Sequence, residues 1–154
     1  MNLGTFFQTV QKMPEAEKMY LRSLEIYERL AKTNPAQFEP NLTMALGCMS
    51  SIYLFVKKYK EAQDAAERAL ALDLNQNFIR TNLGHSYLFR GDWPKAKVLY
   101  ETYLKNEKDP AAAQATLLKD PAAARATLLK DLDDLEAAGI SSPEVEQARG
   151  WLKE

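Results

Sequence analysis

The stretch that decides the fold is Leu83-Gly84-His85-Ser86-Tyr87-Leu88-Phe89-Arg90-Gly91-Asp92-Trp93-Pro94-Lys95-Ala96. Its pattern recurs 34 residues earlier in the chain, because Tyr53 precedes Tyr87 by that interval and Ala62 precedes Ala96 by the same interval. A repeat of this length is typical of helical hairpins that stack and bury their apolar faces on one another. The sequence therefore predicts an all-α repeat protein.

The copies nearer the N-terminus are less regular. The first copy keeps Asn2-Leu3-Gly4 and Glu15-Ala16-Glu17, whereas the second copy has Met49-Ser50 where Leu-Gly is expected. Ala16 and Ala62 are 46 residues apart, so 12 residues beyond one period of 34 separate the first two copies. The repeat thus changes length along the chain.

The spacing Leu-Gly-x-x-Tyr, followed by Ala after eight more residues, resembles the tetratricopeptide repeat. The resemblance covers about residues 2–106, and the longer first interval is similar to that of bacterial members of the family. It implies a right-handed α-solenoid of three helical hairpins with C-terminal capping helices. We expect a single domain over residues 1–154, with repeats at about 2–35, 41–76 and 77–108, a duplicated segment at 109–130 and a cap at 131–154.

The residues that carry the resemblance have physical roles in a hairpin. Gly84 and Ala96 are predicted to lie where two helices approach closely, because a larger side chain would hold the helices apart. Tyr53 and Tyr87 are predicted to fill the space between helices. The pair Gly91-Asp92 is typical of a tight turn. The periodicity and the turn residues together predict helices near 2–11, 14–33, 40–57, 60–73, 77–90 and 93–106.

A near-perfect tandem duplication follows the repeats. The segments 109–119 and 120–130 differ at one position, which is Gln114 in the first and Arg125 in the second. Pro121 within a continuous helix would remove a hydrogen bond and kink the helix. We therefore expect two segments, at about 110–119 and 121–138, and the first copy is either a helix of the fold or a loop. The duplication is recent or engineered, since old repeats diverge.

The C-terminal region is expected to close the array. Gly139 is the predicted end of the helix that contains the second copy. Ser142-Pro143-Glu144 is predicted to start a last helix that ends near Trp151-Leu152, because a polar cap precedes a proline in its first turn. The opposite end starts at Asn2-Leu3-Gly4, part-way through a first repeat helix. We expect either a fragment of a longer array or an open end that packs on another surface.

Composition excludes several functional classes. The net charge of −1 gives no reason to expect nucleic acid or an anionic membrane as a partner. No apolar run reaches the ~18 residues of a spanning helix, and we find no signal peptide at the start. The single cysteine, Cys48, excludes an internal disulfide and fits a reducing compartment. We therefore expect a cytoplasmic protein.

The sequence lacks the constellations that catalysis needs. His85 is the only histidine and Cys48 the only cysteine, so no metal-ligand spacing exists, and the glycines form no phosphate loop. A Cys48–His85 site is disfavoured, because a lone cysteine more often packs as a small apolar group. The acidic residues of 131–136 are expected on a solvated helix face. We predict no catalytic residue, no metal and no cofactor.

In tetratricopeptide proteins the first helix of each hairpin lines a concave groove that holds a peptide or a helix. We name as the predicted groove the seven side chains that the resemblance places there: Met44, Ser51, Phe55, Phe78, Asn82, His85 and Phe89. Leu54 and Phe55 recur 34 residues later as Leu88 and Phe89, which favours an apolar or amphipathic partner. In the alternative, these four side chains pack under a neighbouring helix, such as the C-terminal one.

Two polar groups of the predicted groove have their own alternatives. His85 is either an exposed or partly buried polar residue or a hydrogen-bonding contact to a bound peptide. Arg80 lies close to Asn82, but most positions of the family's carboxylate clamp lack Lys and Arg, so binding of a chaperone tail is disfavoured.

Two functional hypotheses result. The first is a non-catalytic protein-interaction scaffold that binds a peptide or helix in its concave groove. The alternative is a self-assembling or engineered structural protein, in which the duplication and the open N-terminal repeat mediate oligomerisation or tail exchange. An enzyme is a distant third.

Overall fold

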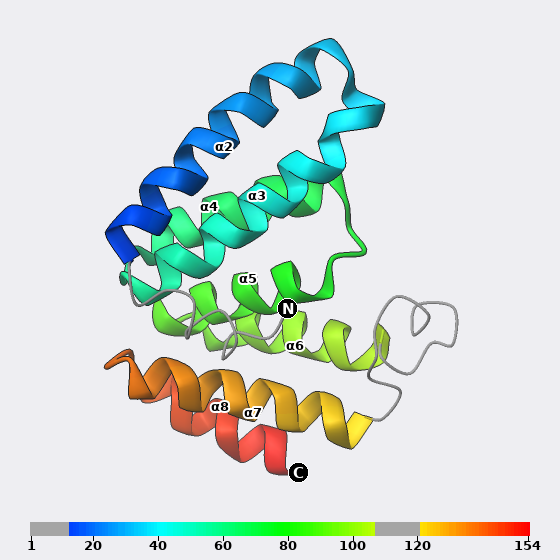
Figure 1. The fold of residues 1–154 in the computed structure, drawn as a ribbon. Coiled ribbons are helices and arrows are strands. Elements are labelled where there is room, and N and C mark those ends of the chain that lie inside the picture. Colours follow the sequence, from blue (N-terminus) through cyan, green and yellow to red (C-terminus); the bar gives the residue numbers. More distant parts are fainter. Residues whose placement is uncertain (1–12, 107–120) are drawn as a thin grey trace.

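The computed structural model describes residues 13–106 and 121–154, and all regular secondary structure in these ranges is α-helical (Figure 1). This confirms the predicted all-α class. The helices are α2 (Met13–Thr33), α3 (Pro35–Phe55), α4 (Tyr59–Leu72), α5 (Asn77–Phe89), α6 (Trp93–Asn106), α7 (Pro121–Ala137) and α8 (Pro143–Lys153).

Consecutive helices pack on one another from α2 to α6, and α3 also packs on α5. In Figure 1 this gives three tiers, with α2, α3 and α4 in the first, α5 and α6 in the second, and α7 and α8 in the third. The third tier contacts α5 and α6. Neighbour-to-neighbour packing of this kind is what a helical-repeat solenoid requires.

Most helix bounds agree with the periodicity. The observed α4, α5 and α6 differ from the predicted ranges by at most one residue at each end. The helix predicted at 121–138 is α7, which ends one residue earlier. The helix predicted at 2–11 and the first duplicated copy at 110–119 lie outside the described residues.

The start of α3 differs from the prediction. A helix was expected from residue 40, but α3 begins at Pro35 and contains Pro40. Asn34 forms the N-cap, since its Oδ1 accepts a hydrogen bond of 3.3 Å from the Gln37 backbone N–H. Pro35 fits the first helical position, where no backbone donor is needed. The helix therefore starts at the better-capped of the two prolines and tolerates the other in its second turn.

The turns have the predicted chemistry. Gly91 has a φ of +81°, which favours glycine, and Asp92 Oδ1 accepts a hydrogen bond of 3.3 Å from the Lys95 backbone N–H at the start of α6. Gly139 has a φ of +76° after the end of α7. The Ile140 N–H then donates to the Leu135 carbonyl at 3.0 Å, a closing bond typical of a glycine-terminated helix.

A close helix contact joins α5 and α6. A Cβ atom added at Gly84 would lie 2.5 Å from Cε1 of Tyr100, which is too short for any real side chain. Ala96 and Tyr100 are both fully buried on the facing side of α6. The predicted close approach at Gly84 is therefore present.

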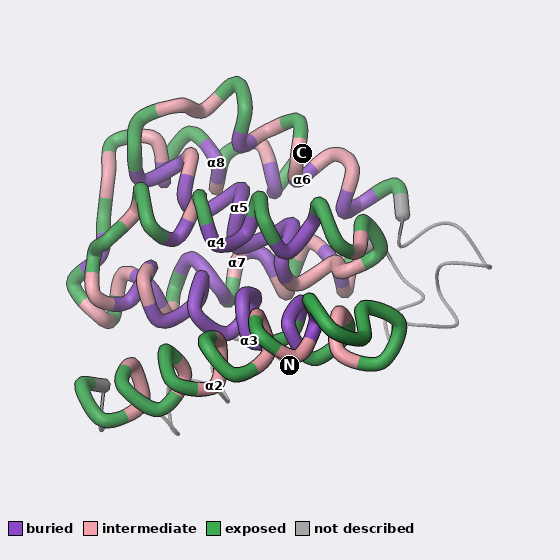
Figure 2. Tube along the Cα trace, turned by 90° about the horizontal axis from the view of Figure 1, so that it is seen from above, coloured by how far each residue is buried: buried purple, intermediate pink, exposed green. Residues whose placement is uncertain are grey.

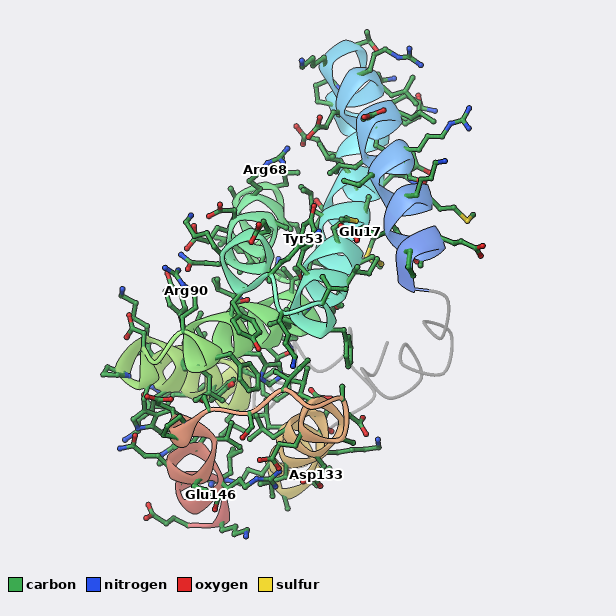
Figure 3. The ribbon with its side chains drawn as sticks, turned by 90° about the vertical axis from the view of Figure 1, so that its left-hand side faces the viewer. Glu17, Tyr53, Arg68, Arg90, Asp133 and Glu146 are labelled. Atoms are coloured by element: carbon green, nitrogen blue, oxygen red, sulfur yellow. The ribbon has the colours of Figure 1, made fainter. Side chains whose placement is uncertain are left out.

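Helix α2 is the least buried part of the described chain (Figure 2). Polar contacts connect it to the following hairpin. Lys58, just before α4, donates to Glu17 at 2.7 Å, and Arg68 of α4 pairs with Glu28. Figure 3 shows Glu17 beside Tyr53 of α3. These exposed pairs contribute little stability, so apolar packing on α3 determines the position of α2.

Two glycine-to-alanine substitutions distinguish the effect of close helix packing on stability from the effect of helix propensity. Gly84→Ala should lower the free energy of unfolding by about 1–3 kcal/mol, because the new methyl group collides with Tyr100. Gly150→Ala in α8 meets no atom within 4 Å, so it should raise stability by up to about 1 kcal/mol. Urea denaturation followed by circular dichroism measures both. Equal effects of the two substitutions would contradict the contact at Gly84.

Candidate protein-interaction surface

The predicted groove is largely closed. Ser51, Phe55, Asn82, His85 and Phe89 are buried, and Phe78 is partly buried. Met44 differs from the others, since 42% of its surface is exposed. The contacts of each side chain explain the difference.

Asn82 connects α5 to α3. Its Nδ2 group donates to Ser50 Oγ at 2.8 Å and to Ser51 Oγ at 2.7 Å. Ser50 Oγ in turn donates to the Gly47 carbonyl at 2.7 Å. All these groups are buried, so breaking the network would leave polar atoms without partners. Asn82 and Ser51 therefore stabilise the contact between two repeats.

His85 connects three helices. Its Nδ1 shares a hydrogen bond of 2.7 Å with the hydroxyl of Tyr100 on α6, and its Nε2 lies 3.7 Å from Asp131 Oδ2 on α7. Burial, and next the charge of Asp131, raises the pKa of Tyr100 well above its usual range, so the phenol keeps its proton. The arrangement that satisfies most groups has Tyr100 donating to Nδ1 and the proton of Nε2 facing Asp131.

Asp131 is a residue that the sequence reasoning missed. It was expected on a solvated face, yet it is 4% exposed. Its position gave a signal, because Asp131 follows Leu128 by three residues and precedes Leu135 by four, and both leucines are fully buried. That spacing places Asp131 on the apolar face of α7. The other acidic residues of this run are exposed or partly exposed, and Asp133 pairs with Arg149 of α8 at 2.6 Å (Figure 3).

The repeated apolar pairs lie in the core. Leu54, Phe55, Leu88 and Phe89 belong to one buried cluster that also contains apolar residues of α7 and α8. The Phe89 ring stacks on Tyr59 of α4 with centroids 5.6 Å apart. This favours the alternative in which the four side chains pack against neighbouring helices.

Phe78 and Arg80 hold the start of α5. Phe78 packs over Gly47, where an added Cβ would lie 2.8 Å from the Phe78 ring. Arg80 donates to the Asn77 side chain and to the Leu74 carbonyl, so its guanidinium closes the α4–α5 turn. Burial lowers its pKa from the usual arginine value.

Met44 lines a hollow between the start of α3 and the α4–α5 turn. The hollow has a volume of about 320 Å³, and its lining includes Pro40 and Met44 from α3 and Leu72 from α4. Glu39 and Asp73 supply the charged groups of the lining. Figure 1 shows the α4–α5 turn on the same side of the molecule as the start of α3. A second, more open hollow of about 480 Å³ is lined by α2 alone.

Catalytic chemistry finds little support in the described ranges. Cys48 is 8% exposed, and burial raises the pKa of its thiol, although a hydrogen bond with Tyr20 acts in the opposite direction. His85 is engaged by Tyr100 rather than by a nucleophile. Residues 13–106 and 121–154 contain no acidic, cysteine or histidine cluster suited to a metal ion. In the same ranges, none of the helices has the length and hydropathy needed to span a membrane.

The role of His85 in packing can be tested with a pair of tyrosine substitutions. Tyr100→Phe should cost about 1–3 kcal/mol of folding stability, because it leaves the buried His85 Nδ1 without its partner. Tyr59→Phe is the control, since the Tyr59 hydroxyl has no hydrogen bond within the part of the chain that the structure describes, and it should change stability by less than about 0.5 kcal/mol. Thermal and urea unfolding measure the difference, and a Tyr100→Phe protein as stable as the control would contradict this role.

Comparison with known families gives one match. The sequence profile described as Tetratricopeptide repeat matches residues 1–35. Neither the curated proteins nor the solved structures give a significant match. Repeats of this family generally mediate contacts between proteins, and the family is typically non-catalytic. The matched repeat and the stacked helices confirm the predicted resemblance to the tetratricopeptide repeat family.

Proposed function

We propose that the chain is a non-catalytic scaffold that binds a peptide or helix of a protein partner at the hollow between the start of α3 and the α4–α5 turn. The tetratricopeptide match at residues 1–35 supports this role, because the family mediates protein contacts. The lone buried Cys48 fits residence in the reducing cytoplasm.

The observation that carries the proposal is the exposure of Met44 beside a hollow that α3 lines on one side and α4 and the α4–α5 turn line on the other. The buried members of the predicted groove already have partners in the chain, as Asn82 and His85 illustrate. Met44 lines the hollow at the start of α3, and this end of α3 lies away from the α7–α8 tier (Figure 1). Binding there would leave the packing of the C-terminal helices undisturbed.

The chemistry of the hollow favours an apolar side chain of the partner. A thioether is polarisable and flexible, so Met44 adapts to partners of different shape. Leu72 and the two prolines add rigid apolar surface. The volume of about 320 Å³ lies at the low end of the range for small-molecule sites, and it suits one or two side chains of a peptide.

A selection experiment tests the proposal. Peptides selected from a displayed random library on the full chain should bind Met44→Glu at least about tenfold more weakly, because a carboxylate would replace the apolar contact. Val98→Glu on α6 is the matched control, since Val98 is 60% exposed and lies outside the hollow. Fluorescence anisotropy gives the dissociation constants. Peptides that bind both variants equally would place the binding face elsewhere.

The duplicated segments 109–119 and 120–130 are the reason to test self-assembly as the alternative function. If the scaffold proposal is right, light scattering coupled to size exclusion should give a mass near 17.4 kDa at all concentrations. A larger species that becomes a monomer when residues 109–119 are deleted would instead favour assembly through the duplication.

A further inference from the structure

We infer that the hollow beside Met44 receives a basic amphipathic peptide, one that combines an apolar side chain with a neighbouring lysine or arginine. This inference rests on the proposed function and gives the partner its chemistry. Its basis is the combination of exposed apolar surface, two carboxylates and the absence of a basic residue in the lining.

The apolar part of the surface is continuous across two elements. Met44 is 42% exposed on α3, and Leu72 is 37% exposed at the end of α4. Leu74, in the turn that follows, is 70% exposed. Single exposed apolar residues are ordinary, but these three are grouped around one hollow and its adjoining turn.

The charged part of the surface is acidic. Glu39 lines the hollow and forms no ion pair within the described residues. Asp73 accepts hydrogen bonds from the Gln76 side chain at 2.6 Å and from the Asn75 backbone N–H at 2.9 Å. These bonds lower the pKa of Asp73. Both donors are neutral, so the carboxylate keeps its charge without a counter-ion.

No basic side chain offsets these carboxylates within the lining. The hollow contains neither lysine nor arginine among its lining residues. Three basic residues lie close to the lining along the chain. Lys32 precedes Pro35 by three residues and is exposed, and Arg68 pairs with Glu28. Arg80 is 9% exposed and donates to Asn77 and to the Leu74 carbonyl. The described lining residues thus carry two half-buried carboxylates and no basic side chain, which makes the hollow itself negative.

A basic amphipathic segment matches both parts of this surface. An apolar side chain would enter between Met44 and Leu72. The aliphatic part of a following lysine or arginine would cover Leu74 while its charged end approaches Glu39, because Asp73 already accepts two hydrogen bonds. An acidic peptide would bring like charges together, which disfavours the wrong partner more strongly than the apolar contact favours it.

Two synthetic amphipathic peptides of equal length provide the probe. They share leucines at helical spacing, and all other positions are lysine-rich in one and glutamate-rich in the other. Titrated into the full chain labelled with 15N, the lysine peptide should shift the amide signals of Met44, Leu72 and Gln76. The glutamate peptide should bind at least about tenfold more weakly.

A charge-removing variant tests the role of Glu39. Glu39→Gln should weaken the lysine peptide about threefold to fivefold, which is the range of one exposed ion pair. Glu101→Gln on α6 is the matched control, because Glu101 lies outside the hollow, and it should leave the affinity unchanged. The effect of Glu39→Gln should disappear in high salt.

The outcomes separate this inference from the proposed function. If both peptides shift Met44 and bind with equal affinity, the basic preference is wrong and the binding face stands. If the lysine peptide shifts other regions or binds Glu39→Gln like the unmodified chain, the hollow is not its site and the inference fails. The proposed function then depends on the library-selected peptides and their response to Met44→Glu.

Discussion

The packing of Tyr100 determines how the rest of the molecule is arranged. Its ring occupies the space above Gly84, where a Cβ atom would collide with it, so α5 and α6 pack closely at this point. Its hydroxyl bonds His85, and His85 faces Asp131 on α7. Trp93 lies against Tyr100 with centroids 6.4 Å apart and against Trp151 of α8 at 5.9 Å. One side chain thereby links the last repeat to both helices of the C-terminal tier.

This constraint explains why most of the predicted groove is unavailable to a ligand. A buried polar group without a partner costs folding free energy, so each one introduced at a helix contact must find its partner in the chain. Asn82 does so with Ser50 and Ser51, and Nδ1 of His85 does so with Tyr100. The polar residues that signalled recognition in the sequence are therefore the ones that fix the spacing between repeats, and the exposed surface lies where α3 extends beyond α5.

The sequence predicted the helices better than the site. The 34-residue period and the turn at Gly91-Asp92 placed α4, α5 and α6 to within one residue, because both signals are local. The prediction placed the start of α3 at Pro40, but a helix can begin before a proline when an earlier residue caps it, as Asn34 does here. The predicted groove residues lie on the expected helices, but several of their partners lie on other helices, as with Asn82 and Ser51. Asp131 shows what a local sequence pattern does not predict, because its role depends on His85, which is 46 residues away in sequence.

If the proposed function is right, recognition and the Tyr100 cluster occupy different parts of the described array. In a stack whose tiers contact only their neighbours, a change at one end has a small energetic effect at the other. The Tyr100 cluster joins the second and third tiers, whereas the hollow lies between α3 and the turn that enters the second tier. Glu39 and Met44 are at the surface and contribute little to the core, so this region tolerates changes of charge and size. Partner specificity could thus change by substitution around the hollow, while the Gly84–Tyr100 contact keeps the spacing of the array constant.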